Sequence, residues 1–251
     1  MRYPGKAFGT TGGFPEPVLK NNKKFVLRWQ QNFISNYIQR DLPALGFPAE
    51  PDKAHRLLQM LASANGGPLN FSELARSLGI SVPSAKTYFG FFENAFLVHR
   101  LKPWSTNLKK RIVKTPRLYF SDTGMLHYLL GVSSHSALIG HIGAGASWEN
   151  FVINQVKSVL SPDDECFYHR TQDGSEIDLL VRRNNQWLFG AEIKLSNAPK
   201  ITRGNYLAMS DINLPKLHII TPEADNYLLK ENVEVHSLRG FMDKLIQWGR
   251  Y

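Results

Sequence analysis

The spacing of apolar residues predicts that the first third of the chain is helical. Between residues 25 and 40, apolar side chains recur at 26, 29, 33, 34, 37 and 38, which is the period of one helix face. Leu42-Pro43 should end this helix, because proline restricts the residue before it. Residues 1–24 show no such period and are rich in Gly, Pro and Lys, so we expect an extended arm.

Residues 25–117 are expected to form a helical and winged-helix domain. Helices are predicted at 54–64, 72–78 and 82–95, and Gly79-Ile80-Ser81 is a tight turn between the last two. Strands are predicted at 96–101 and 111–114, on either side of a basic loop. This outline is typical of DNA-binding winged helices, although winged helices also dock proteins. The expected nucleic-acid contacts are Lys86 on the last helix and Lys109, Lys110, Arg111 and Lys114 on the wing.

Residues 118–251 alternate strand and helix patterns, which predicts an α/β domain. Buried strands are expected at 118–120, 217–221 and 233–236, and a closing helix at 240–248. Asp122 is expected to cap a helix that starts near Gly124, and Ser147 to cap another. The fold class is therefore α/β, with a helical domain before a strand-rich one.

A hairpin between residues 174 and 194 carries two acids and a lysine within otherwise apolar strands. If residues 184–186 form the loop, antiparallel pairing places Asp178 opposite Glu192, about 5 Å apart on one face. Lys194 shares that face, because strand side chains repeat every second residue. Two adjacent carboxylates are unfavourable unless they are neutralised, and a divalent cation is the usual remedy.

An ordinary ion pair is the alternative for this hairpin. The same register puts Glu176 opposite Lys194, and Asp178 could cap a loop. Glu192 is harder to explain in that way, because it lies between Ala191 and Ile193 in an apolar strand. An unpaired carboxylate there would cost several kcal/mol.

The spacing of Asp178 and Glu192-Ile193-Lys194, with thirteen residues between the two acids, resembles that of the PD-(D/E)xK nuclease superfamily. Glu149 fits the acidic residue that the superfamily carries on the preceding helix, whereas Ile177 stands where its proline is expected. The resemblance implies a restriction-endonuclease-like (PD-(D/E)xK) α/β domain at 118–251. It also implies phosphodiester hydrolysis with Mg²⁺ or Mn²⁺.

The resemblance gives each of these residues a role. Asp178, Glu192 and the Ile193 carbonyl would hold the cation. Lys194 would orient or activate the attacking water, and Glu149 would hold a metal-bound water or a second cation. The four catalytic residues implied are Glu149, Asp178, Glu192 and Lys194.

Nearly the whole chain also resembles the C-terminal part of a bacterial and archaeal family of AAA-type ATPases. The residues that carry this likeness are Gly13-Phe14-Pro15-Glu16-Pro17, Tyr37-Ile38-Gln39-Arg40-Asp41, Leu118-Tyr119-Phe120-Ser121-Asp122-Thr123-Gly124, Trp148-Glu149-Asn150 and the hairpin. The ATP-binding half of that family is missing, and no G-x-x-x-x-G-K-[ST] motif occurs, so we expect no ATP site in this chain.

Two functions follow as hypotheses. The first is a nucleic-acid-binding protein with a metal-dependent nuclease-like domain, derived from an ATPase family. The second is a non-catalytic DNA- or protein-binding module that positions an AAA-type ATPase. The expected partners are DNA and either an AAA-type ATPase domain or a second copy of the chain.

Charge and composition refine this view. The net charge is +9, and residues 100–117 carry seven basic and no acidic side chains, which favours contact with a phosphate backbone. No apolar run is long enough for a membrane span and no signal peptide is recognisable, so we expect a cytoplasmic protein without a membrane partner.

Replacing Lys109, Lys110 and Arg111 together with alanine should weaken the salt dependence of duplex DNA binding. Each phosphate contact contributes a slope near −0.9 to the plot of log affinity against log salt, so the slope should flatten by up to about 2.7. Fluorescence anisotropy at four salt concentrations measures it. An unchanged slope would mean that these residues are only solvated.

Overall fold

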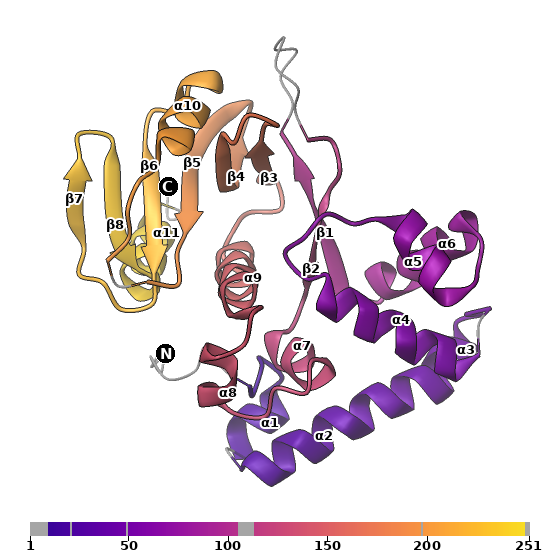
Figure 1. Cartoon of the computed structure of the whole chain (residues 1–251). Helices are drawn as coiled ribbons and strands as arrows, with labels where there is room; N and C mark the ends of the chain where they lie inside the picture. The colour runs from indigo at the N-terminus through magenta and orange to yellow at the C-terminus, as the bar shows by residue number, and fades with distance from the viewer. Residues whose placement is uncertain (1–9, 21, 49, 105–112, 197, 249–251) are drawn as a thin grey trace. The chain divides into compact units, whose positions relative to one another are not determined.

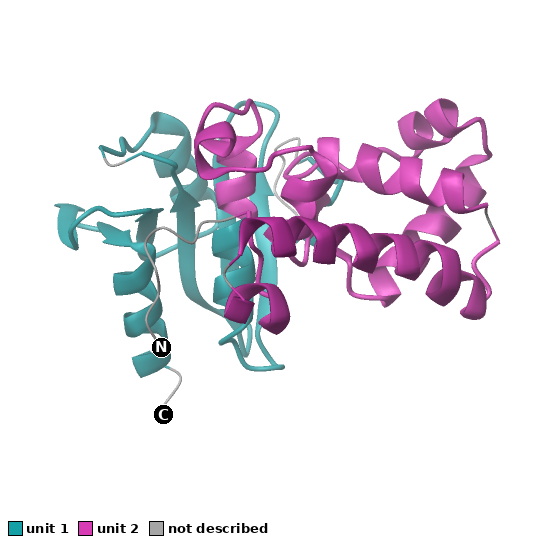
Figure 2. Ribbon diagram, turned by 90° about the horizontal axis from the view of Figure 1, so that it is seen from below, with its two compact units in different colours: residues 1–5, 101–116, 151–251 teal, residues 6–100, 117–150 magenta. Residues whose placement is uncertain are grey.

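The computed structural model describes residues 10–20, 22–48, 50–104, 113–196 and 198–248. The chain divides into two compact units (Figure 2). Unit 1 comprises residues 1–5, 101–116 and 151–251, and unit 2 comprises residues 6–100 and 117–150. This division differs from the expected boundary after residue 117, because strand β2 (Arg117–Phe120) and the first half of helix α9 (Ala144–Lys157) belong with the N-terminal helices.

Unit 2 is mainly helical. Its helices α1 to α6 precede strand β1 (Val98–Pro103), and helices α7 and α8 follow β2 (Figure 1). The bounds of the helices in unit 2 are α1 Pro15–Lys20, α2 Lys23–Asn36, the π-helix Tyr37–Asp41, α3 Leu42–Ala44, α4 Pro51–Ser63, α5 Phe71–Leu78, α6 Val82–Asn94, α7 Thr123–Leu129 and α8 His135–Ile139. Their buried leucines and phenylalanines form one hydrophobic core.

The described part of the expected arm is not extended, because residues 15–20 form helix α1. The preceding residue, Phe14, packs against the rings of Trp29 and Phe33 at centroid distances of 4.9 and 5.0 Å. The Gly13 N–H donates to Asp122 Oδ2 over 2.6 Å. Asp122 Oδ1 accepts from Met125 N–H at 2.8 Å, so the prediction that Asp122 caps a helix is confirmed.

The helix expected to stop at Leu42-Pro43 continues past it. A π-helical turn at Tyr37–Asp41 leads from α2 into α3, and the Leu42 N–H donates to the Tyr37 carbonyl. Pro43 then lies in the first turn of α3 and donates no N–H to the π-helical turn before it.

Helices α4, α5 and α6 follow the predicted helix-turn-helix outline. Asn70 caps α5, Gly79 ends it in the left-handed conformation (φ 65°), and Ser81 caps α6. Phe89 and Phe92 of α6 are buried, while Tyr88 and Phe91 pack against Phe47. The aromatic residues of α6 therefore serve packing.

The strand predicted at residues 111–114 is not found in the described part of this segment. Residues 111 and 112 lie outside the described part of the chain, and residues 113 and 114 are not in a strand. The Val113 N–H donates to the Arg170 carbonyl at the end of strand β3 (Glu165–Arg170). The expected wing is therefore not confirmed in this form.

Unit 1 is built on a mixed sheet with the strand order β1-β3-β4-β5-β6-β8-β7 (Figure 1). Strands β3, β4 (Glu176–Arg183) and β5 (Gln186–Ile193) are antiparallel, whereas β5, β6 (Leu217–Thr221) and β8 (Val233–Ser237) are parallel. Strand β7 (Tyr227–Lys230) is antiparallel to β8 and occupies one edge. The strands expected at 118–120, 217–221 and 233–236 are confirmed.

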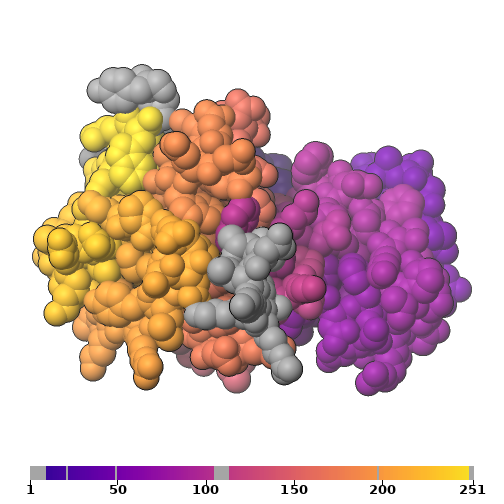
Figure 3. Space-filling model, turned by 90° about the horizontal axis from the view of Figure 1, so that it is seen from above, coloured from indigo at the N-terminus to yellow at the C-terminus, as the bar shows by residue number. Residues whose placement is uncertain are grey.

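Two helices cover opposite faces of this sheet. Helix α10 (Arg203–Asp211) packs Ala208 and Met209 against Ile219 of β6. Helix α11 (Leu238–Trp248) packs Phe241 against Phe189 of β5, on the other face. The outer side of α10 lies at the molecular surface (Figure 3). The central strands are thus covered on both faces, as their continuous apolar runs predict.

The start of α9 is also corrected. The helix begins at Ala144, three residues before the expected cap Ser147. The Ser147 hydroxyl is engaged by the ring of the buried His127 on α7, so it is used for packing between helices and does not cap one. None of the described helices is long and apolar enough to cross a membrane.

Gly204→Ala should lower the melting temperature. A Cβ on Gly204 would lie 2.4 Å from the Gly174 carbonyl oxygen, so α10 would have to move away from the β3–β4 turn. Such overpacking costs roughly 1–3 kcal/mol, more than the roughly 0.5–1 kcal/mol that alanine gains in a helix. The matched control is Gly90→Ala in α6, where nothing lies within 4 Å of the added Cβ. Calorimetry that finds the two variants equally stable would contradict this packing.

Candidate functional site

The β4–β5 hairpin brings the two predicted acids together by an unexpected route. Its turn has two residues, Asn184 and Asn185, both with positive φ (50° and 64°), where the sequence predicts a loop of three. A bulge between Val181 and Arg182 restores the register, so that Leu179 pairs with Ala191. Continuing this ladder by one residue places Asp178 opposite Glu192.

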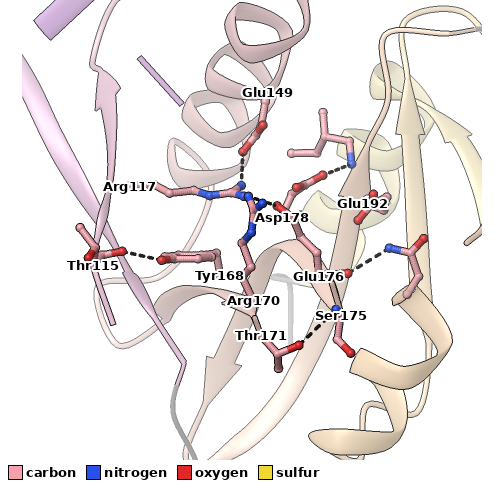
Figure 4. Close-up of polar contacts among 12 residues, drawn as sticks. Thr115, Arg117, Glu149, Tyr168, Arg170, Thr171, Ser175, Glu176, Asp178 and Glu192 are labelled. Atoms are coloured by element: carbon pink, nitrogen blue, oxygen red, sulfur yellow. Dashed lines mark hydrogen bonds and ion pairs between the residues drawn. The ribbon is translucent and has the colours of Figure 1, made fainter. Parts of the chain in front are cut away.

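Both carboxyl groups are buried, with Asp178 7% and Glu192 4% exposed. Asp178 Oδ2 accepts the Ile193 N–H over 2.9 Å, and Lys194 Nζ lies 2.6 Å from Glu192 Oε1 (Figure 4 shows the two acids). Glu192 Oε2 is buried and has no hydrogen-bond partner among the described residues. The hairpin therefore holds two carboxyl groups and an ammonium group, with one carboxyl oxygen not satisfied.

Burial and the neighbouring Asp178 raise the pKa of Glu192 to about 8, against the opposing effect of Lys194. Burial alone would lower the pKa of Lys194, but the Glu192 carboxylate outweighs it and raises that pKa. Without a cation, burial beside Asp178 thus favours the protonated form of Glu192. A bound cation would replace that proton.

Lys194 contacts Glu192, its neighbour on the same face, as strand alternation predicts. Glu176, the partner expected in the ion-pair alternative, lies 3.6 Å from Arg170 of β3. The Asn205 side chain of α10 donates to the Glu176 carbonyl over 3.0 Å, which ties α10 to the start of β4.

Glu149 belongs to unit 2 and is described there with its own partners. Its carboxylate lies 2.9 Å from the Arg117 guanidinium (Figure 4). It also accepts a hydrogen bond from the Tyr119 hydroxyl. Arg117 and Tyr119 are two residues apart on β2, so strand alternation predicts that they share a face. No spacing in the sequence predicts that this face meets Glu149 of α9. The expected role of Glu149 beside the hairpin acids stays a prediction.

The expected nucleic-acid contacts are only partly described. Lys86 is exposed on α6, 6.0 Å above the Phe71 ring, and Lys114 is exposed in unit 1. Lys109, Lys110 and Arg111 lie outside the described residues. Contact with DNA therefore stays a prediction.

Glu192→Gln should remove a pH dependence of stability. An ordinary glutamate loses its proton near pH 4.5 and the folded Glu192 near 8, so the folded state loses stability as the pH rises between these values. In thermal melts of the metal-free proteins, the melting temperature of the variant relative to that of the parent should rise between pH 5.5 and pH 8.5. The control is Glu231→Gln, which replaces an exposed carboxylate. If Glu192→Gln and the parent differ in melting temperature by the same amount at both pH values, the pKa of Glu192 is not raised.

Comparisons with known proteins assign the chain to a family. A profile described as a domain of unknown function (DUF8612) matches residues 8–136, and a second (DUF4143) matches residues 144–241. Uncharacterized proteins of Mycobacterium tuberculosis and Mycobacterium bovis are each 34% identical over 222 residues, which cover 88% of this chain and 50% of theirs. The chain thus spans about half the length of these curated relatives, and no solved structure matches it. Because the first profile matches half of the chain, the chain belongs to the family defined by the domain of unknown function DUF8612.

Proposed function

We propose that this chain is a nucleic-acid-binding protein whose hairpin site hydrolyses phosphodiester bonds of DNA with Mg²⁺ or Mn²⁺. The observation that carries the proposal is the buried pair Asp178 and Glu192, with Lys194 in contact with Glu192. Burying two adjacent carboxyl groups costs free energy, either as repulsion between two charges or as the unfavourable protonation that the raised pKa of Glu192 reflects. The PD-(D/E)xK resemblance supplies a function for it.

The donor set fits a hard divalent cation. Carboxylate and carbonyl oxygens are the ligands that Mg²⁺ and Mn²⁺ prefer, and Glu192 Oε2 is a buried oxygen without a partner among the described residues. Asp178, Glu192 and the Ile193 carbonyl would hold the ion. When bound, the ion would polarise the phosphate and lower the pKa of a water molecule.

The chain's own residues would prepare the reaction. The Ile193 N–H orients the Asp178 carboxylate. Lys194 keeps positive charge beside Glu192, where it would orient the attacking water and offset charge on the phosphate in the transition state. Arg170, half exposed at the end of β3, would bind the substrate phosphate from the rim.

DNA contact is proposed for the helix-turn-helix of unit 2. The aromatic side chains of α6 pack against other residues of unit 2. Lys86 and Thr87 are exposed near the start of α6, which is the part of a recognition helix that approaches DNA. The basic segment 100–117 would add phosphate contacts. The resemblance to AAA-type ATPases makes such an ATPase domain, or a second copy of this chain, the proposed partner.

One observation favours the non-catalytic alternative. The hairpin acid Glu192 has an ammonium partner, and Glu149 has a guanidinium and a hydroxyl partner, so side chains of the protein itself already compensate these acids. In that case the sheet would only position an ATPase on DNA. The alternative predicts no response to divalent metal.

Thermal melts with and without Mn²⁺ test the proposal. The parent should gain about 2.7 kcal/mol when Mn²⁺ reaches a hundredfold excess over its dissociation constant, because only the folded state offers the site. Asp178→Asn should abolish this gain, and its amide oxygen can still accept the Ile193 N–H. Lys194→Ala should keep a gain from Mn²⁺ but lose cleavage of a labelled DNA duplex.

A parent that neither melts higher with Mn²⁺ nor cleaves DNA would overturn the nuclease proposal. A parent that binds Mn²⁺ without cleaving single- or double-stranded DNA would reduce it to a metal-binding module. Glu231→Gln is the matched control, because it removes an exposed carboxylate of unit 1 far along the chain from the hairpin. Its gain from Mn²⁺ should equal that of the parent.

A further inference from the structure

A second group of potential ligands lies on the other face of the unit 1 sheet. His218 of β6 pairs in register with Glu234 of β8, and His236 follows Glu234 by two residues, so all three side chains share one face. Glu192 pairs with Ile219, which points to the opposite face. This group is therefore separated from the hairpin site by the sheet itself.

The three ligand atoms form a compact triangle. His218 Nδ1 lies 3.1 Å from His236 Nε2, His236 Nε2 lies 3.2 Å from Glu234 Oε2, and His218 Nδ1 lies 3.6 Å from the same oxygen. A tetrahedral zinc ion with bonds of about 2.0–2.1 Å keeps its ligand atoms about 3.3–3.4 Å apart. The triangle therefore has the size of three corners of a zinc coordination sphere.

Aromatic side chains enclose the group on the side of helix α11. The His218 ring lies 5.2 Å from the Phe241 ring and 5.7 Å from the Trp248 ring. His218 and His236 are 1% and 5% exposed, so the two imidazoles lie in a largely apolar pocket of side chains.

Two lysines now neutralise the acid. Lys216 Nζ lies 2.7 Å from Glu234 Oε1 and Lys244 Nζ lies 2.5 Å from Oε2. Burial alone would raise the pKa of Glu234, but these two ammonium groups outweigh it and lower that pKa to about 2. Their side chains are 45% and 31% exposed, so each can turn to solvent on its flexible stem when a cation takes the carboxylate.

We propose that His218, Glu234 and His236 form a site for a divalent transition metal, zinc above all. Two nitrogen donors and one carboxylate suit zinc and disfavour Mg²⁺ and Ca²⁺, which prefer oxygen ligands. Three protein ligands leave a fourth position for water or an exogenous ligand. Such an ion would join β6 to β8 under α11 and is independent of the proposed nuclease activity.

Zinc titration of the full chain tests the site, with Asp178→Asn as the background so that the hairpin acids do not contribute. After removal of metal with a chelator, calorimetry with Zn²⁺ should show one ion bound per chain. His236→Gln should lower the affinity at least tenfold. His135→Gln removes an exposed histidine of unit 2 and should leave the affinity unchanged.

Lys244→Met gives an independent arm of the test. It removes the ammonium that competes for Glu234 Oε2 without touching a proposed ligand, so zinc affinity should rise severalfold. Circular dichroism of the metal-free variants establishes that they fold. Absence of one-to-one zinc binding in the background protein, or equal affinity in the background, His236→Gln and Lys244→Met proteins, would overturn the site.

Discussion

The burial of Glu192 on strand β5 is the constraint on which the candidate site depends. β5 lies between β4 and β6 and is covered on both faces, so water cannot solvate a carboxylate there as it does at the surface. Asp178 adds a second carboxyl group to the same place, and Lys194 compensates only one oxygen of Glu192. Such an arrangement costs free energy in the absence of a cation, and this cost is the physical basis for assigning the hairpin a chemical role.

The register of the hairpin is what keeps the two acids together. Side chains alternate between faces, so a slip of one residue would move Asp178 to the face that carries His218. The two-residue turn Asn184-Asn185 by itself would produce that slip, and the bulge at Val181 and Arg182 reverses it. A turn and an irregularity that are both far from the acids thus decide whether the acids meet.

The same alternation separates two kinds of chemistry across one sheet. The face towards α10 presents carboxyl oxygens at Asp178 and Glu192, which suit hard cations. The face towards α11 presents imidazole nitrogens at His218 and His236, which suit zinc. Neighbouring residues of β6, Ile219 and His218, point to the two faces. One layer of strands therefore separates two groups of side chains with different ligand preferences.

Local sequence determined much of this structure, because its signals act over a few residues. The cap Asp122 was predicted from a side chain that bonds the next turn, and strands β6 and β8 were predicted from their apolar residues. The apposition of Asp178 and Glu192 was predicted from a loop of three residues, and it holds because the bulge offsets the shorter turn of two. The helix α1 was missed because its stability comes from packing and not from its own period.

Only the tertiary structure decided the longer-range contacts. Glu149 meets Arg117 and Tyr119 through the packing of α9 on β2, and no spacing in the sequence encodes that meeting. His218 meets Glu234 because β6 and β8 are parallel, and a parallel pair has no tight turn from which its register can be counted. The sequence by itself therefore determines that one hairpin carries both acids, whereas the histidine group forms only once the sheet is assembled, because its residues come from strands without a shared turn.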